Sequence, residues 1–427
     1  MSRFLVVPAF VVLMGAGAPS LHGQQSLASQ LEDLLLFGDC GGRLCLLLDP
    51  LNNHSDHYTG DASAAGDLVI GFLRGAIGLS LGNLPFASAN SGTLLTVEGG
   101  NLVQTEVSAG PFYAERALTL GKGRLFLGAN VSGVALSEVR GIATDDLRFT
   151  FTHVDDNQVL GDRDVENDLI NVNMTLDLSL VAASFMLAYG LTDRIDLSLQ
   201  LPVVRASLDA SSQGFIDENT PGSGNHRFFD TGGSVSGVSR VTGTKTGVGD
   251  IGVRLKANAY SGRNFELGLL ADARLPTGSE DDFLGAGGSS FRALGLASGR
   301  MGTFAPHLNL GIARISGTAP RTSFLSAIGF DMLLGSSTTL AGDILANLEM
   351  SESELTIPGP ATFNAGRSTT IPRINVPHQK DHLVDASIGL KILAAEGVRI
   401  ALNSLVPLSS GGMYGNMLWT LGVEVLR

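Results

Sequence analysis

Charged side chains at alternating positions within apolar segments are the residues of this chain that could handle a solute. The segment 247–256 places Arg254 and Lys256 on one face of a strand and Val253 and Leu255 on the other, because successive strand side chains point to opposite faces. Such charges either pair across a confined interior or line a polar path, since an unpaired buried charge is costly. The same alternation gives a set of lumen-facing candidates: Arg124, Arg194, Asp196, Arg254, Lys256, Glu266, Asp272, Arg274, Asp343, Glu349, Asp385, Lys391, Arg399 and Glu424.

Catalytic and metal-binding patterns are missing from the sequence. It contains no GxSxG elbow, no HExxH helix and no set of Cys and His at metal-ligand spacing. The acidic run between His153 and Asp168 could suggest calcium, but its spacing does not match an EF-hand loop, and we expect a solvated loop. We therefore expect no enzyme, no cofactor and no metal.

Two further groups of residues could act at the ends of the molecule. Phe215, Phe228 and Phe229 fall in the longest predicted loop, where they could form an apolar entry site for a substrate or pack their own loop. Cys40 and Cys45 bracket the short loop CGGRLC. They could form a disulfide in an oxidising compartment, the alternative being two buried thiols.

The elements that carry these side chains must be strands. Residues 1–23 have the charge and apolar run of a signal peptide, and no later stretch approaches the roughly 18 consecutive apolar residues of a spanning helix. The chain is 44% hydrophobic, only 16% charged, and has 55 glycines. Since only helices and closed barrels satisfy every backbone group in lipid, the apolar strand faces predict an all-β antiparallel transmembrane barrel in contact with outer-membrane lipid.

Residues 24–122 differ from the rest of the chain. A short helix is expected from Ser26 to Leu36, an apolar run without clean alternation follows at 66–81, and Gly99-Gly100 lies between two β-prone runs, as in a hairpin turn. We expect this part to be a periplasmic or lumen-plugging segment.

The barrel proper is expected at 123–427, with strands of about ten residues. Since both ends should lie in the periplasm, the strand number must be even; treating Leu147 to His153 as an external hairpin gives about 12, with 14 as the alternative. A switch of the apolar face near Val181 to Ala183 predicts a β-bulge. Short, periplasmic turns are expected at Leu191 to Arg194, Ser261 to Arg263, Ser298 to Gly302, Leu334 to Ser337 and Ala395 to Gly397, and long external loops at 206–247, 276–288 and 350–382.

Four segments carry a resemblance to a known family: 110–124 (GPFYAERALTLGKGR), 189–204 (YGLTDRIDLSLQLPVV), 247–256 (GVGDIGVRLK) and 274–278 (RLPTG). They resemble bacterial outer-membrane proteins associated with phenol-degradation meta-pathways, which are loosely related to importers of hydrophobic compounds. By themselves, the motifs indicate turns and strand ends more than ligand contacts.

The resemblance implies a channel or transporter of the bacterial outer membrane for small hydrophobic or aromatic molecules. Its alternatives are a non-conducting structural or surface barrel and a secreted soluble β-protein. We also expect the barrel-assembly machinery to act during biogenesis, and a net charge of −13 argues against nucleic acid as a partner.

Overall fold

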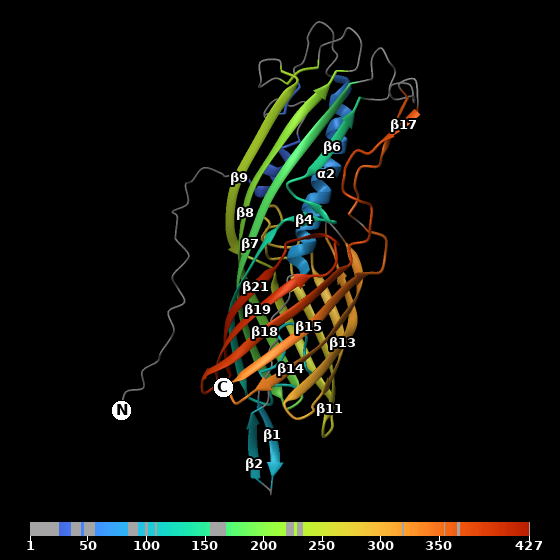
Figure 1. Cartoon of the computed structure of the whole chain (residues 1–427). Coiled ribbons are helices and arrows are strands. Elements are labelled where there is room, and N and C mark those ends of the chain that lie inside the picture. The colour runs from blue at the N-terminus through green and yellow to red at the C-terminus, as the bar shows by residue number, and fades with distance from the viewer. Residues whose placement is uncertain are drawn as a thin grey trace, which may run out of the picture.

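Antiparallel strands close into a ring in the computed structural model of the chain (Figure 1). Fourteen strands share one sheet, and all of them except β6 and β9 form the ring, which closes where β7 pairs with β8. The predicted number of 12 barrel strands is therefore confirmed. The structure describes residues 25–35, 44–46, 56–83, 93–98, 101–106, 109–153, 168–218, 226–228, 234–317, 320–353, 355–364 and 368–426.

Neighbouring strands of the ring follow one another in chain order. The long connections between them all lie at one end of the barrel. They are β3 (Leu125–Leu136), β7 (Leu169–Thr192), β8 (Ile195–Asp217), β10 (Ile251–Ser261), β11 (Phe265–Leu275), β12 (Ser290–Gly299), β13 (Phe304–Ile315), β14 (Arg321–Leu334), β15 (Thr338–Glu349), β18 (Leu383–Ala395), β19 (Val398–Pro407) and β21 (Leu418–Leu426). All five predicted short turns lie where they were expected, and we call their side of the barrel the short-turn end.

The outer face of the ring is apolar. On β10, Val253 and Leu255 are exposed while Arg254 and Lys256 are buried inside the barrel, which confirms the predicted faces of this strand. On β14 and β18, the side chains of Ile328 and Ile388 also point outward, with exposed fractions of 60% and 62%. A band of large apolar side chains around a closed barrel is the surface that a bilayer requires.

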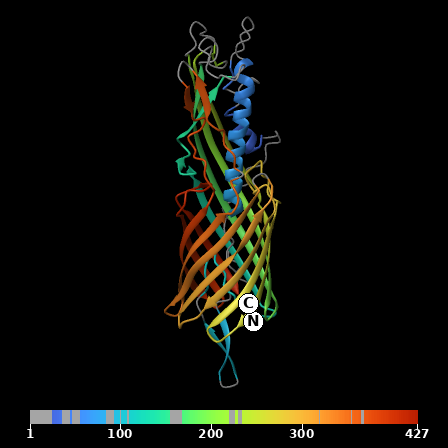
Figure 2. The same ribbon diagram turned by 90° about the vertical axis from the view of Figure 1, so that its right-hand side faces the viewer.

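Two strands extend far beyond the ring at the long-loop end (Figures 1 and 2). β7 has 24 residues and β8 has 23. Their upper halves pair with β6 (Leu147–Thr152) and β9 (Ser236–Val248), forming a four-stranded extension. The prediction that Leu147 to His153 forms a strand outside the barrel is confirmed, whereas most of the predicted loop 206–247 is strand.

Helices α1 (Leu27–Glu32) and α2 (Asp56–Asn83) accompany the extension (Figure 1). Phe72, Ile77 and other apolar side chains of α2 join a core with Phe149, Leu176 and further inward residues of the extension. The stretch Ala64–Gly82 is long and apolar enough to cross a membrane, but 61% of its most apolar window is buried inside the protein. Its apolar character is explained by this core.

The polarity of the sheet reverses between the ring and the extension. In the ring, β8 points Leu199 outward and Ser198 inward; in the extension it points Asp209 outward and Leu208 inward. β7 does the same, and its pairing with β3 and β8 runs without a register shift through 181–183. The predicted bulge is therefore wrong: the environment of the two faces changes, not the direction of the side chains.

The remaining elements are short. A hairpin of β1 (Thr93–Glu98) and β2 (Asn101–Glu106) projects beyond the short-turn end (Figure 1). The predicted turn residues Gly99 and Gly100 lie outside the described residues. The loops at the other end contain β4 (Glu138–Val139), β5 (Ile142–Ala143), β16 (Ala361–Asn364), β17 (Ser368–Ile371) and β20 (Met413–Tyr414).

Candidate functional site

The interior of the barrel is occupied by residues 109–124, which we call the inner segment. This stretch comes after the β1–β2 hairpin and leads directly into β3. Its Glu115 and Arg116 are only 3% and 4% exposed. The inner segment therefore lies among wall side chains that would otherwise face an open lumen.

Side chains of the wall satisfy the backbone of the inner segment. Asn309 of β13 exchanges two hydrogen bonds with the backbone of Glu115, at 2.7 and 2.8 Å. The N–H of Ala117 donates to Ser298 Oγ at 2.8 Å, and the N–H of Leu120 donates to Asp196 Oδ2 at 2.8 Å. Buried backbone groups need such partners, and here the wall, not a secondary-structure ladder, supplies them.

Ion pairs add to this anchorage. Glu115 pairs with Arg254 and, at 3.3 Å, with Lys256 on β10. Arg116 pairs with Asp331 on β14. All five of these side chains are nearly fully buried, so removing one would leave an uncompensated charge, which costs far more than losing an exposed pair.

Lys391 ties the start of the inner segment to the opposite wall. Its Nζ donates to the carbonyl oxygen of Pro111 at 3.1 Å, pairs with Glu424 at 2.8 Å, and lies 4.9 Å from the centre of the Phe112 ring. The inner segment is thus bound to strands on several sides of the ring.

Most of the predicted lumen charges do point inward. Arg194 is the exception: it lies in the exposed turn between β7 and β8, where its N–H bonds to Thr192 Oγ1 at 3.1 Å. Arg124 and Asp385 are half-buried. Fully buried in the interior are Asp196, Arg254, Lys256, Glu266, Asp272, Arg274, Asp343, Glu349, Lys391, Arg399 and Glu424.

Sequence reasoning missed three wall residues and both charges of the inner segment. Asp331 and Asn309 hold the inner segment, and His307 bonds to Asp343 at 2.6 Å. The alternation of β13 and β14 could have placed these three inward. Nothing local distinguishes Glu115 and Arg116 from residues of an ordinary loop.

The four motif segments contact one another in pairs. Asp250 of 247–256 accepts hydrogen bonds from the N–H groups of Gly278 (3.0 Å) and Ala286 (2.8 Å), which holds the loop 276–288 against the rim. At the short-turn end, Asp193 of 189–204 accepts from the N–H of Lys122 at 3.2 Å. These contacts agree with the interpretation of the motifs as turn and folding signals.

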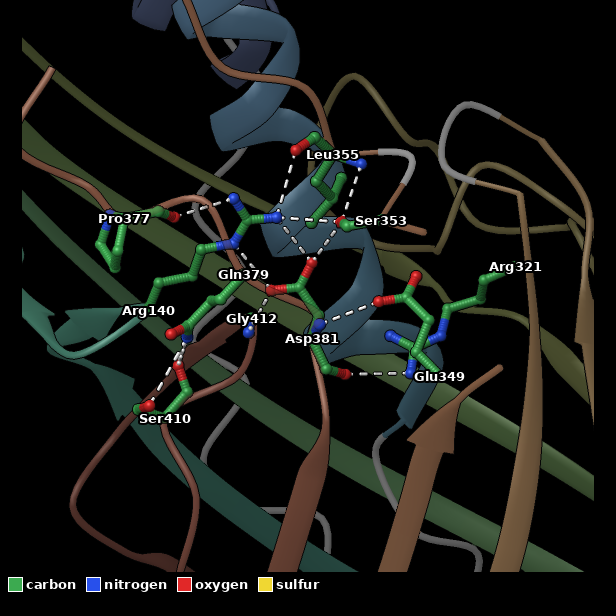
Figure 3. A network of polar contacts seen from close by, with 10 residues as sticks. All are labelled: Arg140, Arg321, Glu349, Ser353, Leu355, Pro377, Gln379, Asp381, Ser410 and Gly412. Carbon is green, nitrogen blue, oxygen red and sulfur yellow. Dashed lines mark hydrogen bonds and ion pairs between the residues drawn. The ribbon is translucent and has the colours of Figure 1, made fainter. Parts of the chain in front are cut away.

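A polar network joins several loops at the long-loop end of the barrel (Figure 3). The Arg140 guanidinium donates to both oxygens of Asp381, at 2.9 and 2.8 Å, and to the Leu355 carbonyl at 3.1 Å. It also lies 5.0 Å from the centre of the Phe72 ring on α2. We call this network the cap; it joins the loop before β6, the loop 350–382 and helix α2.

Asp381 is the centre of the cap. Its carboxylate also accepts hydrogen bonds from the Gly412 N–H and the Ser353 hydroxyl, both at 2.8 Å, and its own N–H donates to Glu349 Oε2 at 2.8 Å. Burial favours the protonated acid, but the hydrogen bonds and charge of Arg140, with the contributions of Gly412 and Ser353, hold the pKa of Asp381 below its ordinary value.

Among the described residues, two cavities lie between the wall and the elements inside it. One, of about 70 Å³, lies beside Leu81 at the end of α2 and is lined by Asn130, Gln200 and Arg274. The other, of about 130 Å³, lies above Tyr113 and Glu115 of the inner segment.

The entry-site candidates do not form one surface. Phe228 has no exposed area and fits against two paired glycines, where a Cβ at Gly214 would approach its ring to 2.8 Å. Its role as an exposed capture residue is corrected: it belongs to the core of the extension. Phe215 is 36% exposed on the outer side of β8.

Some of the predicted residues and segments lie outside the part of the chain that the structure describes. These are Phe229, the signal peptide 1–23, residues 154–167 of the acidic run and Cys40. Cys45 itself is buried and disulfide-bonded.

No protein-family model and no curated protein matches the sequence. Among solved structures, an outer membrane channel from Pseudomonas putida F1 is 12% identical, over 73% of this chain and 98% of that one, with a TM-score of 0.43. A deletion mutant of the monoaromatic hydrocarbon channel TodX is also 12% identical, over 73% and 92%, with a TM-score of 0.33. A Pseudomonas aeruginosa FadL homologue is 11% identical, over 71% and 89%, with a TM-score of 0.30. At these values the similarity adds no evidence on substrate or mechanism.

Proposed function

We propose that this protein is a bacterial outer-membrane channel for small hydrophobic or aromatic molecules, seen here in a closed state. The apolar outer band of the ring supports the membrane location. The choice of solute draws on the resemblance of the four motif segments to the phenol meta-pathway family.

The observation that carries the proposal is that a separate segment of chain fills the barrel. A ring of about eight strands is just narrow enough for wall side chains to fill, and this ring has 12. Its buried charges Arg254, Lys256 and Asp331 pair with the inner segment. A barrel with a purely structural role needs no such insert, whereas a channel needs a part that can move.

Two barriers lie in series along the proposed path. The cap closes the long-loop end, and the inner segment closes the middle of the ring. A solute would pass the cap, reach the 130 Å³ cavity and leave when the inner segment shifts. The number of hydrogen bonds that hold each barrier explains why the channel would rest closed.

Conductance across planar bilayers tests the proposal. In the double variant Glu115→Gln/Arg116→Gln, the inner segment loses its ion pairs with Arg254, Lys256 and Asp331, and breaking one buried pair costs about 3–5 kcal/mol. We expect long-lived openings that the wild-type protein shows rarely. Glu396→Gln, in an exposed turn at the short-turn end, removes a charge without touching the interior and should behave as wild type.

Uptake of a labelled monoaromatic solute by cells that lack the native protein completes the test. Expression of the wild-type chain should accelerate uptake, and the double variant should accelerate it further. A silent double variant, together with uptake that is indifferent to expression, would favour the non-conducting structural barrel.

A further inference from the structure

The 130 Å³ cavity has the dimensions of a binding site for one small molecule. It lies inside the ring, with Tyr113 and Glu115 of the inner segment on one side and strands β11 to β19 around it. On the side of the cap, its lining residue Asn347 accepts a hydrogen bond from Arg321, which also donates to the Asp381 carbonyl. An apolar cavity of roughly 150 Å³ is enough to hold benzene.

The wall of this cavity combines leucines with polar and charged side chains. Six strands each contribute one leucine: Leu270, Leu294, Leu325, Leu345, Leu383 and Leu405. Leucines facing a barrel interior that otherwise carries charges form an apolar belt at one level of the lumen. Such a belt favours a ring or a short alkyl chain, because each Å² of hydrocarbon removed from water contributes roughly 25 cal/mol.

The charges in the cavity differ in whether they already have partners. Arg254 pairs with Glu115, and Arg292 donates to Asp272 at 2.7 Å. Asp385, by contrast, makes no hydrogen bond or ion pair with any residue in the described part of the chain, although it is half-buried. A carboxylate in such surroundings is stabilised by a donor, most of all by a cation.

We infer that this cavity binds a small organic amine, with its apolar body on the leucine belt and its ammonium group on the Asp385 carboxylate. The inference rests on the proposed channel function and narrows its substrate class. A neutral hydrocarbon would leave the carboxylate without a partner, and a carboxylate ligand would be repelled by it. An alcohol could donate one hydrogen bond, but a charged donor binds roughly twice as strongly.

Calorimetry with the full-length protein in lipid nanodiscs tests the inference, with empty nanodiscs as the blank. The probes are benzylamine, toluene and benzoate, which share one ring and differ in the group attached to it. We expect benzylamine to bind tightest and benzoate weakest. Asp385→Asn should weaken benzylamine at least about tenfold while leaving toluene unchanged.

Two further variants control the result. Asp209→Asn removes an exposed carboxylate from the outer side of β8 and should not alter any affinity. Leu345→Phe puts a larger side chain into the cavity, keeps Asp385, and should weaken binding of both benzylamine and toluene. It tests the location even if Asp385→Asn does not fold.

Three results would overturn the inference: benzylamine affinity that is equal in wild type and Asp385→Asn, benzoate binding tighter than benzylamine, or benzylamine affinity that is unchanged in Leu345→Phe. The conductance test is independent of these results. Channel openings in the Glu115→Gln/Arg116→Gln variant, together with no amine binding by the wild-type protein, would refute the inference and leave the channel proposal standing. Amine binding without conductance or uptake would remove the channel proposal alone.

Discussion

The Arg140–Asp381 pair allows a quantitative test of the cap. Both side chains are 1% exposed, and Arg140 makes its two contacts to Asp381 at 2.9 and 2.8 Å. In Asp381→Asn the Arg140 charge stays buried without a counter-charge, which costs about 3–5 kcal/mol. Asparagine keeps one acceptor oxygen, so we expect a cost at the lower end of this range, about 3 kcal/mol. This cost corresponds to an increase on the order of a hundredfold in the equilibrium constant for opening of the cap.

Amide hydrogen exchange measures this opening directly. The N–H of Arg140 donates to the Gly412 carbonyl at 2.8 Å and reports on the cap without touching the mutated side chain. Asp146→Asn is the matched control, because its pair with Arg148 is more than half exposed on both sides and contributes little. Exchange at Arg140 in Asp381→Asn within threefold of wild type, or an equal effect of Asp146→Asn, would refute the reasoning.

The same residue predicts the pH dependence of the cap. Because the folded-state pKa of Asp381 is lowered, its ionisation stabilises the folded cap, and this contribution is fully present above the unfolded-state pKa of about 3.9. It is lost as the pH falls through the lower folded-state pKa. The protection of the Arg140 N–H, taken relative to the intrinsic exchange rate at each pH, should therefore fall below about pH 4 in wild type and show no such step in Asp381→Asn.

Three other predictions concern the barrel and its extension. Leu269→Arg, on the exposed apolar face of β11, should cost about 2–4 kcal/mol of barrel stability in a bilayer, whereas Ser207→Arg, on the outer face of β8 in the extension, should cost nothing measurable in urea unfolding. Phe228→Ala should destabilise the extension by about 3–5 kcal/mol, because the ring is fully buried, and limited proteolysis would detect this. An epitope tag within 350–382 should be accessible on intact cells and one at 261–263 should not; reversed accessibility would invert the assigned orientation.

The local pattern of the sequence determined the secondary structure of the ring. A strand period of two is a property of neighbouring residues, so the faces of β10, the short turns and the total of 12 strands could be predicted. The exclusion of Leu147 to His153 from the ring followed from the even strand number. These features need no knowledge of which segments meet.

The tertiary structure alone decided what each face meets. On β8, Leu199 points outward and Leu208 points inward. The reason is that the ring carries its apolar side chains on its outer face, whereas the extension packs its apolar side chains against α2. The same hydrophobic pattern therefore suggested a bulge that does not exist. The inner segment shows this limit most clearly: Glu115 and Arg254 are 139 positions apart in the sequence, and neither residue's neighbours contain any trace of the other. Contacts between distant segments are fixed by the closure of the ring, and only the folded chain reveals them.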